Sequence, residues 1–245
     1  MKEFAHWRWQ SGASFLLACF IALSTQAQKT DIPDWKVLRM DMVDKQIKRR
    51  GIKDPAVLEA MRAVKRHELV PQPYRKMAYE DHPLPIGEDQ TISQPYIVGL
   101  MSELMQVEPG DKILEIGTGS GYQAAVLAVL GLKVYSIEII EPLATRAAAD
   151  LKRLGYLDVQ VKQGDGYLGW PEEAPFDGII ITAAPPQLPQ PLVDQLKIGG
   201  RLVVPVGRRD QDLNVYTRKP DGTVSKKTII PVRFVPMTGR AQDDP

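Results

Sequence analysis

The chain has 245 residues, of which 44% are hydrophobic and 25% charged, with 31 Lys plus Arg against 30 Asp plus Glu. This composition excludes a disordered chain, a collagen-like repeat and a polytopic membrane protein, and the formal net charge of +1 gives no strong overall attraction to nucleic acid. The single cysteine, Cys19, excludes an intramolecular disulfide and a zinc site with two or more thiolates, and no metal site is expected.

Residues 1–35 are predicted to form an N-terminal extension. A short basic region precedes an apolar run over 12–23 and small residues that end at Ala27, the pattern of a secretory signal peptide cleaved after residue 27. The run is too short to cross a bilayer comfortably. A lipoprotein signal around Cys19, a retained extension and a start codon assigned too early remain alternatives.

Two helices are expected next along the chain. Apolar residues recur at helical spacing over 35–50, and Gly51 ends this first helix. Asp54 provides an N-cap and Pro55 occupies the first helical position of the second helix.

A long loop or lid is predicted over residues 67–95, because the apolar periodicity is lost and Pro, Gly, Asp and Gln are frequent. A further helix follows over 94–106. Ser93 stands immediately before it, where a serine commonly serves as an N-cap.

Short apolar strands then alternate with helices, which predicts a parallel sheet covered on both faces. Strands are expected at 112–116, 133–137, 159–162, 176–182 and 201–206, and helices at 122–130, 141–154 and 191–196. Two further runs, 213–218 and 223–235, flank the turn signal Pro220-Asp221-Gly222 and predict an antiparallel strand pair.

The expected fold class is therefore α/β, with a doubly wound, mostly parallel sheet, an N-terminal helical and loop cap and a C-terminal antiparallel strand pair. Residues 36–245 are expected to form a single domain. Its parts are the cap and substrate loop (36–109), the cofactor-binding core (110–206) and the C-terminal strands (207–245).

The strongest local signal is a glycine loop between the first core strand and the next helix. Gly117, Gly119 and Gly121 allow a tight turn and close approach to a ligand at the carboxyl end of the strand. The dinucleotide fingerprint would require glycine at Tyr122, so NAD is disfavoured, and the Gly-Lys-Ser/Thr of a nucleoside triphosphate site is absent from the loop.

Carboxylates at three strand ends strengthen the prediction of a nucleoside site. Glu138 ends the second core strand, where it can accept hydrogen bonds from ribose hydroxyls, and Asp165 follows the third, near an adenine amino group or nearby backbone. Glu115, ahead of the loop, suits a ligand that bears an amino group. The alternatives are a solvated strand-end carboxylate for Glu138 and an Asp-Gly turn for Asp165.

This combination resembles the class I methyltransferase pattern for S-adenosylmethionine. The resemblance implies that the cofactor is S-adenosyl-L-methionine and that S-adenosyl-L-homocysteine is the product. It implies no metal. The candidate cofactor-binding residues are Glu115, Gly117, Thr118, Gly119, Ser120, Gly121, Glu138, Asp165 and Gly166.

Nucleic acid is not the expected methyl acceptor. Many nucleic-acid N-methyltransferases hold the target amine with Asn or Asp before Pro-Pro after the fourth strand, and this chain has Ala184 there. The near-neutral charge also disfavours nucleic acid as the acceptor. The chain lacks the cysteine pair that methylation of a base carbon would require.

From about Met42 to Gly239 the chain resembles the protein-L-isoaspartate O-methyltransferase family in the order and spacing of its motifs. Lys65 stands where proline is common in that family, and Glu88-Asp89 stands where a glycine usually precedes Gln90. The motifs include Val64-Lys65-Arg66-His67-Glu68-Leu69-Val70-Pro71, Gln90-Thr91-Ile92-Ser93-Gln94-Pro95, the run from Glu115 to Gln123, Thr182-Ala183-Ala184 and Arg233-Phe234-Val235-Pro236.

The resemblance implies methylation of the α-carboxylate of L-isoaspartyl residues in damaged proteins and peptides. Because a free carboxylate has a pKa of about 3.5, it is already ionised at neutral pH and needs orientation more than a general base. We expect Thr91, Ile92 and Ser93 to line the acceptor site, with the Ser93 hydroxyl orienting the carboxylate as the catalytic residue.

A monomeric, cytoplasmic enzyme is expected, since the family is cytoplasmic and its cofactor is made in the cytosol. Export to the periplasm through residues 1–27 is the alternative, and no stable membrane association is expected unless this segment is retained or lipidated. Two other functions stay open: a methyltransferase for a small molecule or RNA, and a non-catalytic nucleotide-binding module.

Overall fold

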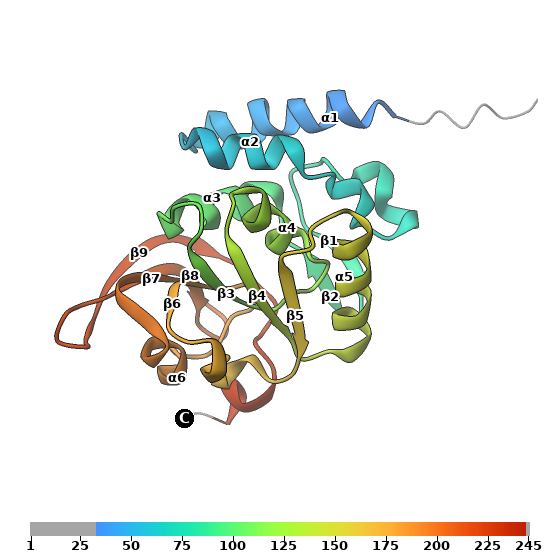
Figure 1. Ribbon diagram of the computed structural model, residues 1–245. Helices are drawn as coiled ribbons and strands as arrows, with labels where there is room; N and C mark the ends of the chain where they lie inside the picture. The colour runs from blue at the N-terminus through green and yellow to red at the C-terminus, as the bar shows by residue number, and fades with distance from the viewer. Residues whose placement is uncertain (1–32, 244–245) are drawn as a thin grey trace, which may run out of the picture. The chain divides into compact units, whose positions relative to one another are not determined.

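The computed structural model describes residues 33–243, and a seven-stranded sheet lies at its centre (Figure 1). The strand order is β5-β4-β3-β6-β7-β8-β9, in which the first five strands are parallel and β8 pairs antiparallel with both neighbours. The strands are β3 (Lys112–Ile116), β4 (Lys133–Glu138), β5 (Val159–Gln163), β6 (Phe176–Ile181), β7 (Leu196–Val206), β8 (Gln211–Arg218) and β9 (Val224–Val232).

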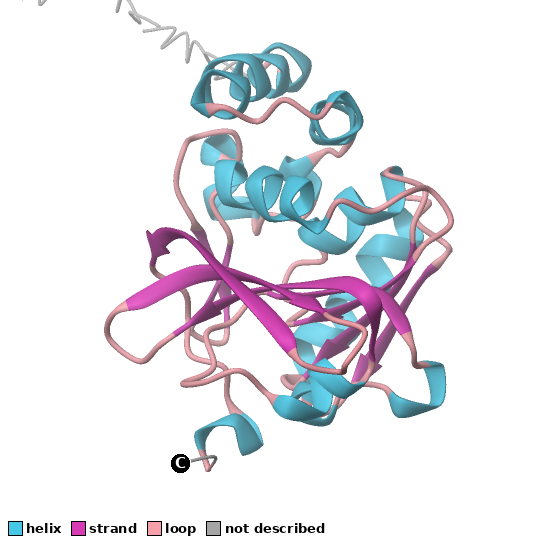
Figure 2. Ribbon diagram, turned by 90° about the vertical axis from the view of Figure 1, so that its left-hand side faces the viewer, coloured by secondary structure: helices cyan, strands magenta, loops and turns pink. Residues whose placement is uncertain are grey.

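Helices cover both faces of the sheet, as Figure 2 shows. Alternate strand residues enter two separate cores: Ile113 packs with helices α3 (Pro95–Met105), α4 (Tyr122–Val129) and α5 (Glu141–Arg153), whereas Leu114 packs with α6 (Gln190–Asp194). This period-two alternation is what a strand buried on both faces produces. The doubly wound, mostly parallel α/β fold with a C-terminal antiparallel pair is confirmed.

The topology fixes where a ligand can bind. The chain leaves β3 for β4 on one side and later returns to place β6 on the other side of β3. The carboxyl ends of β3 and β6 therefore flank a topological switch point, where open α/β sheets bind their ligands.

The first helical segment has a mixed course. α1 (Trp35–Asp41) continues as a π-helix (Met42–Ile47) and a 3-10 turn (Lys48–Arg50), and Gly51 ends it with φ of +102°. Met42 and Ile47 are both buried five residues apart, which matches the i→i+5 repeat of a π-helix. The prediction of one regular helix over 35–50 was therefore wrong in its hydrogen-bond pattern, although the whole segment is helical.

The second helix begins as expected. α2 (Pro55–Ala63) has Asp54 as its N-cap, whose carboxylate accepts hydrogen bonds from the backbone N–H groups of Ala56 (2.8 Å) and Val57 (3.3 Å).

The segment 67–95 contains more regular structure than a loop. Two 3-10 helices, Arg66–Glu68 and Gln72–Met77, precede an antiparallel hairpin of β1 (Leu84–Gly87) and β2 (Gln90–Ile92). The hairpin escaped prediction because its strands are very short and its tip, Glu88-Asp89, lacks the glycine or asparagine typical of tight hairpins. Both tip residues have φ of +53°.

The prediction that Ser93 is an N-cap was wrong. Helix α3 begins at Pro95, whose fixed φ suits the first helical position, and Gln94 takes the cap position without a side-chain hydrogen bond. In the described residues, no helix is long and apolar enough to cross a membrane.

Candidate active site

The glycine loop joins β3 to α4 at the switch point. Gly117, Gly119 and Gly121 all have positive φ, of +95°, +53° and +81°, which L side chains rarely adopt. At Gly117 the requirement is also steric, since a Cβ atom would lie 2.5 Å from the Thr182 Oγ1. Glycine is therefore needed here both for its conformation and for the close approach of β6.

A cavity, called the cofactor cavity below, lies above this loop. Its walls come from the hairpin, the glycine loop, the ends of β4 and β6, and a C-terminal segment over 235–238. Gly117, Gly119, Glu138 and Gly166 line it, as the sequence led us to expect of a cofactor site.

Glu138 is held so that its carboxylate faces this cavity. Its side chain is 5% exposed, and its two oxygens accept hydrogen bonds from the backbone N–H groups of Gly119 (2.8 Å) and Ile140 (3.0 Å). A carboxylate offers about four acceptor positions, so capacity remains for ligand hydroxyls. The residues present therefore fit the ribose of S-adenosylmethionine.

Asp165 lies beside the cavity without lining it. One carboxylate oxygen accepts a hydrogen bond from the backbone N–H of Tyr167 and the other from that of Arg240, both at 2.9 Å. Gly166, the next residue, does line the cavity, and a side chain there would collide with Ile116. Asp165 thus ties the C-terminal segment to the end of β5.

Glu115 lies beneath the glycine loop and is fully buried. It accepts a hydrogen bond from the Ser136 hydroxyl, which lies 2.5 Å from the Thr118 Oγ1. Burial raises the pKa of Glu115 to about 8, and the nearby charge of Glu138 adds to this rise. Glu115 lines none of the cavities at the switch point, so the structure places it against the loop and not in the open space.

Two further cavities meet the first one. A small one, lined by Thr118, Ser120, Ile92 and Ser93 among others, lies against the glycine loop. A larger groove, called the acceptor groove below, is lined by Arg50, Pro83, Thr91, Ser93, Gln94, Ile97, Thr182 and residues 230–235. Thr91 and Thr182 line all three spaces, so these two threonines mark the place where they join.

The three predicted acceptor residues are brought together by β2 and the turn that follows it. Thr91 and Ser93 face the acceptor groove, whereas Ile92 is buried and borders only the small cavity. The Ser93 hydroxyl forms no hydrogen bond with another described residue, so it is available to a ligand.

Sequence reasoning missed Thr182 as a site residue. Its hydroxyl lies 2.6 Å from the carbonyl oxygen of Gly117 and 3.0 Å from that of Ile116, and it can donate its proton to either. The available signal was its position directly after β6, at the switch point, in the Thr182-Ala183-Ala184 motif.

The C-terminal segment over 235–238 forms the roof of the cofactor cavity. Ala184 pairs with it: its N–H donates to the Val235 carbonyl and its carbonyl accepts from the Met237 N–H, both at 2.8 Å. No sequence signal that we used pointed to this pairing, because it joins segments about fifty residues apart.

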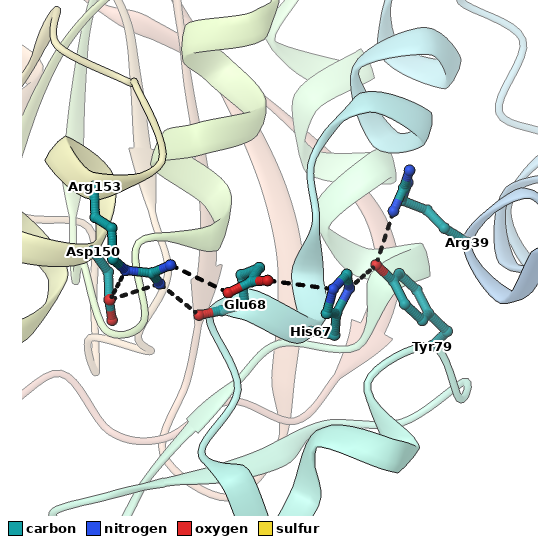
Figure 3. A network of polar contacts seen from close by, with 6 residues as sticks. All are labelled: Arg39, His67, Glu68, Tyr79, Asp150 and Arg153. Carbon is teal, nitrogen blue, oxygen red and sulfur yellow. Dashed lines mark hydrogen bonds and ion pairs between the residues drawn. The ribbon is translucent and has the colours of Figure 1, made fainter. Parts of the chain in front are cut away.

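A polar network in the cap lies apart from these cavities (Figure 3). The Nδ1 of His67 is 2.6 Å from the hydroxyl oxygen of Tyr79, to which Arg39 donates at 3.3 Å. Glu68 continues the network to Arg153 on α5, at 3.2 Å. The His67 ring is stacked on Trp35, and its pKa is lowered by burial. These contacts attach the first helix to the domain.

No group of three or more His, Cys, Asp or Glu residues among residues 33–243 could hold a metal ion.

The doubly wound sheet, the G-x-G-x-G loop after its first parallel strand and the acidic end of the next strand define a class I S-adenosylmethionine-dependent methyltransferase. The family model described as protein-L-isoaspartate(D-aspartate) O-methyltransferase matches residues 38–242. The chain belongs to this family.

Relatives and solved structures agree. The chain is 59% identical to the protein-L-isoaspartate O-methyltransferase of Gloeobacter violaceus over 199 residues, 80% of this chain and 97% of the relative. It is 50% identical over 232 residues to protein-L-isoaspartate O-methyltransferase 1 of Nitrosospira multiformis, covering 93% of this chain and 95% of the relative. A solved protein-L-isoaspartate O-methyltransferase superposes with a TM-score of 0.75 at 30% identity, over 84% of this chain and 67% of the other.

A beta-aspartate methyltransferase from Plasmodium falciparum, solved in complex with S-adenosyl-L-homocysteine, superposes with a TM-score of 0.72 at 27% identity. The match covers 82% of this chain and 98% of that structure.

Proposed function

We propose that this enzyme transfers a methyl group from S-adenosyl-L-methionine to the α-carboxylate of L-isoaspartyl residues in damaged proteins and peptides. The products are the methyl ester and S-adenosyl-L-homocysteine. The observation that carries this proposal is the meeting of the cofactor cavity and the acceptor groove at Thr91 and Thr182. A donor held in one space and a carboxylate held in the other would meet there.

When bound, S-adenosylmethionine supplies a methyl group activated by its sulfonium centre. Glu138 and the glycine loop hold the nucleoside part, and the roof over 235–238 shields it from water. The acceptor carboxylate is ionised at neutral pH, so no general base is required. In agreement with this, no histidine is among the described residues that line the three spaces.

The Ser93 hydroxyl orients the acceptor carboxylate, and Thr91 and Ile92 complete the walls around it. Two observations support this role: Ser93 borders both the acceptor groove and the small cavity against the glycine loop, and its hydroxyl lacks a partner among the described residues. A hydrogen bond from a hydroxyl to a charged carboxylate is strong enough to select one orientation.

Labelled S-adenosylmethionine and a pair of matched peptides, one with an aspartyl and one with an isoaspartyl residue, test the function. We expect base-labile label on the isoaspartyl peptide alone. Equal labelling of both peptides, or labelling of RNA or of a small molecule with neither peptide modified, would contradict the proposal.

We further propose that the enzyme works in the cytoplasm, because its cofactor is made there. We also propose that it is a monomer. The signal-like pattern over 1–27 lies outside the described residues. Sequencing the N-terminus of the protein isolated from cells tests the location: a chain beginning at Met1 supports it, and one beginning at Gln28 or at a lipidated Cys19 contradicts it. Sedimentation equilibrium tests the oligomeric state: the molar mass of one chain supports the monomer, and a multiple of it contradicts the monomer.

A further inference from the structure

The acceptor groove has two walls of different origin. One wall comes from the cap and the start of α3, with Arg50, Pro83 and Ile97, and the other from the end of β9 and the residues after it, over 230–235. The groove is open to solvent, and its lining runs from the cap to residues 230–235, which is more than one isoaspartyl side chain can contact. It therefore also contacts residues that flank the modified one.

The charged side chains that line the groove are all positive in the described part of the chain. Among the described residues that line it, the charged ones are Arg50 and Arg233, and neither aspartate nor glutamate is present. Arg50 lies 3.6 Å from the centre of the Tyr96 ring and 3.0 Å from a carboxylate oxygen of Asp81, so its position is fixed and its charge partly balanced.

Arg233 differs from Arg50 in having no partner among residues 33–243. Its guanidinium forms no ion pair or hydrogen bond with another described residue, and apolar side chains of Ile230, Val232 and Phe234 border the groove around it. A guanidinium binds carboxylates in a bidentate geometry.

We propose that Arg233 binds a second carboxylate of the substrate, on a residue next to the isoaspartyl residue, so that the enzyme prefers damaged sites in acidic sequence. This inference rests on the proposed function, because it concerns the same groove. Arg50 on the opposite wall adds to the positive potential but is already paired with Asp81.

The test uses isoaspartyl peptides that differ only in Glu or Gln at the two positions flanking the isoaspartyl residue, and compares kcat/KM at low salt. Since an exposed ion pair contributes at most about 1 kcal/mol, we expect a preference of about threefold for Glu on at least one side. Raising the salt to about 1 M should remove it, because the screening length falls to about 3 Å.

Variants locate the effect. In Arg233→Gln the ratio of kcat/KM for the Glu peptide to that for the Gln peptide should fall to about one, and Arg233→Lys should restore part of it. Lys226→Gln makes the same charge change on β9, seven residues before Arg233 and outside the groove, and should leave the ratio unchanged.

A wild-type ratio of one, or an undiminished ratio in Arg233→Gln, would overturn the acidic preference while the Gln peptide is still methylated. Failure to methylate any isoaspartyl peptide would instead overturn the proposed function.

Discussion

At the scale of single residues, two hydroxyl groups at the candidate site differ in their hydrogen-bond partners. The hydroxyl of Thr182 is used within the protein, where it hydrogen-bonds the carbonyl oxygens beneath the glycine loop. The hydroxyl of Ser93 has no partner in the described part of the chain and can therefore bind a ligand. Substitutions at the two positions should therefore affect different kinetic constants.

Ser93→Ala should lower kcat/KM for an isoaspartyl peptide about tenfold, since a hydrogen bond to a charged group contributes about 1.5–3 kcal/mol. Because Gln94 and not Ser93 occupies the cap of α3, the melting temperature should not change. Methyl transfer and thermal unfolding measured on the same preparation separate the two effects. An unchanged kcat/KM would rule out the orienting role.

Thr182→Val keeps the shape of the side chain and removes its hydroxyl. The carbonyl oxygen of Gly117 then loses a 2.6 Å hydrogen bond, at a cost of about 1–3 kcal/mol, and the loop is held less firmly. We expect the KM for S-adenosylmethionine to rise about tenfold. Thr182→Ser is the matched control that keeps the hydroxyl, and similar KM values in the two variants would contradict the prediction.

Glu115 should give the stability a particular pH dependence. The pKa of Glu115 rises from 4.5 to about 8 on folding. Its contribution to the free energy of unfolding is therefore complete below pH 4.5 and is lost as the pH rises towards 8. Glu115→Gln, which resembles the protonated form, should remove this loss. Each pKa unit corresponds to about 1.4 kcal/mol in the free energy of unfolding.

Urea unfolding at several pH values from 4.5 to 8 measures the difference between wild type and Glu115→Gln. A difference that does not vary with pH would show that Glu115 is ionised in the folded protein.

At the scale of secondary structure, the core elements were predictable because their signals are local. The strands at Lys112–Ile116 and Lys133–Glu138 are largely apolar runs, and the glycine loop marks the turn between β3 and α4. Asp54-Pro55 likewise identified the start of α2. The β1–β2 hairpin was not predictable from these signals, since short strands are stabilised mainly by tertiary contacts such as the 2.5 Å hydrogen bond from Arg146 to the Ile86 carbonyl.

The same distinction applies to the site. The place of the glycines and Glu138 beside the cavity could be predicted from their position relative to strands, and the residues proposed to hold the acceptor come from family resemblance. The roof over 235–238 could not, because its pairing with Ala184 depends on the packing of distant segments.

Asp54→Ala tests whether the N-cap of α2 stabilises the protein. Loss of the two hydrogen bonds to Ala56 and Val57 should lower the free energy of unfolding by about 1 kcal/mol. Asp54→Asn retains an acceptor and should stay near the wild type in a chemical denaturation experiment. Equal destabilisation by both variants would attribute the effect to something other than capping.

At the scale of the whole molecule, cofactor binding should stabilise both the sheet and its C-terminal roof. S-adenosylhomocysteine at about 100 times its Kd should raise the free energy of unfolding by about 2.7 kcal/mol. Hydrogen exchange should show added protection at the N–H groups of Met237 and Arg240, which bond to Ala184 and Asp165. Thermal stabilisation without protection of the roof would contradict its part in binding.

The roof also has a consequence for synthesis of the protein. The strand ends at the cavity, those of β3, β4 and β6, are made well before residues 235–238, which line its other side. Domains generally begin to fold from the N-terminal side during translation. We expect a nascent chain that has emerged only as far as β7 to lack this side of the cavity, so that cofactor binding requires residues 235–238 to have been made and to have paired with Ala184.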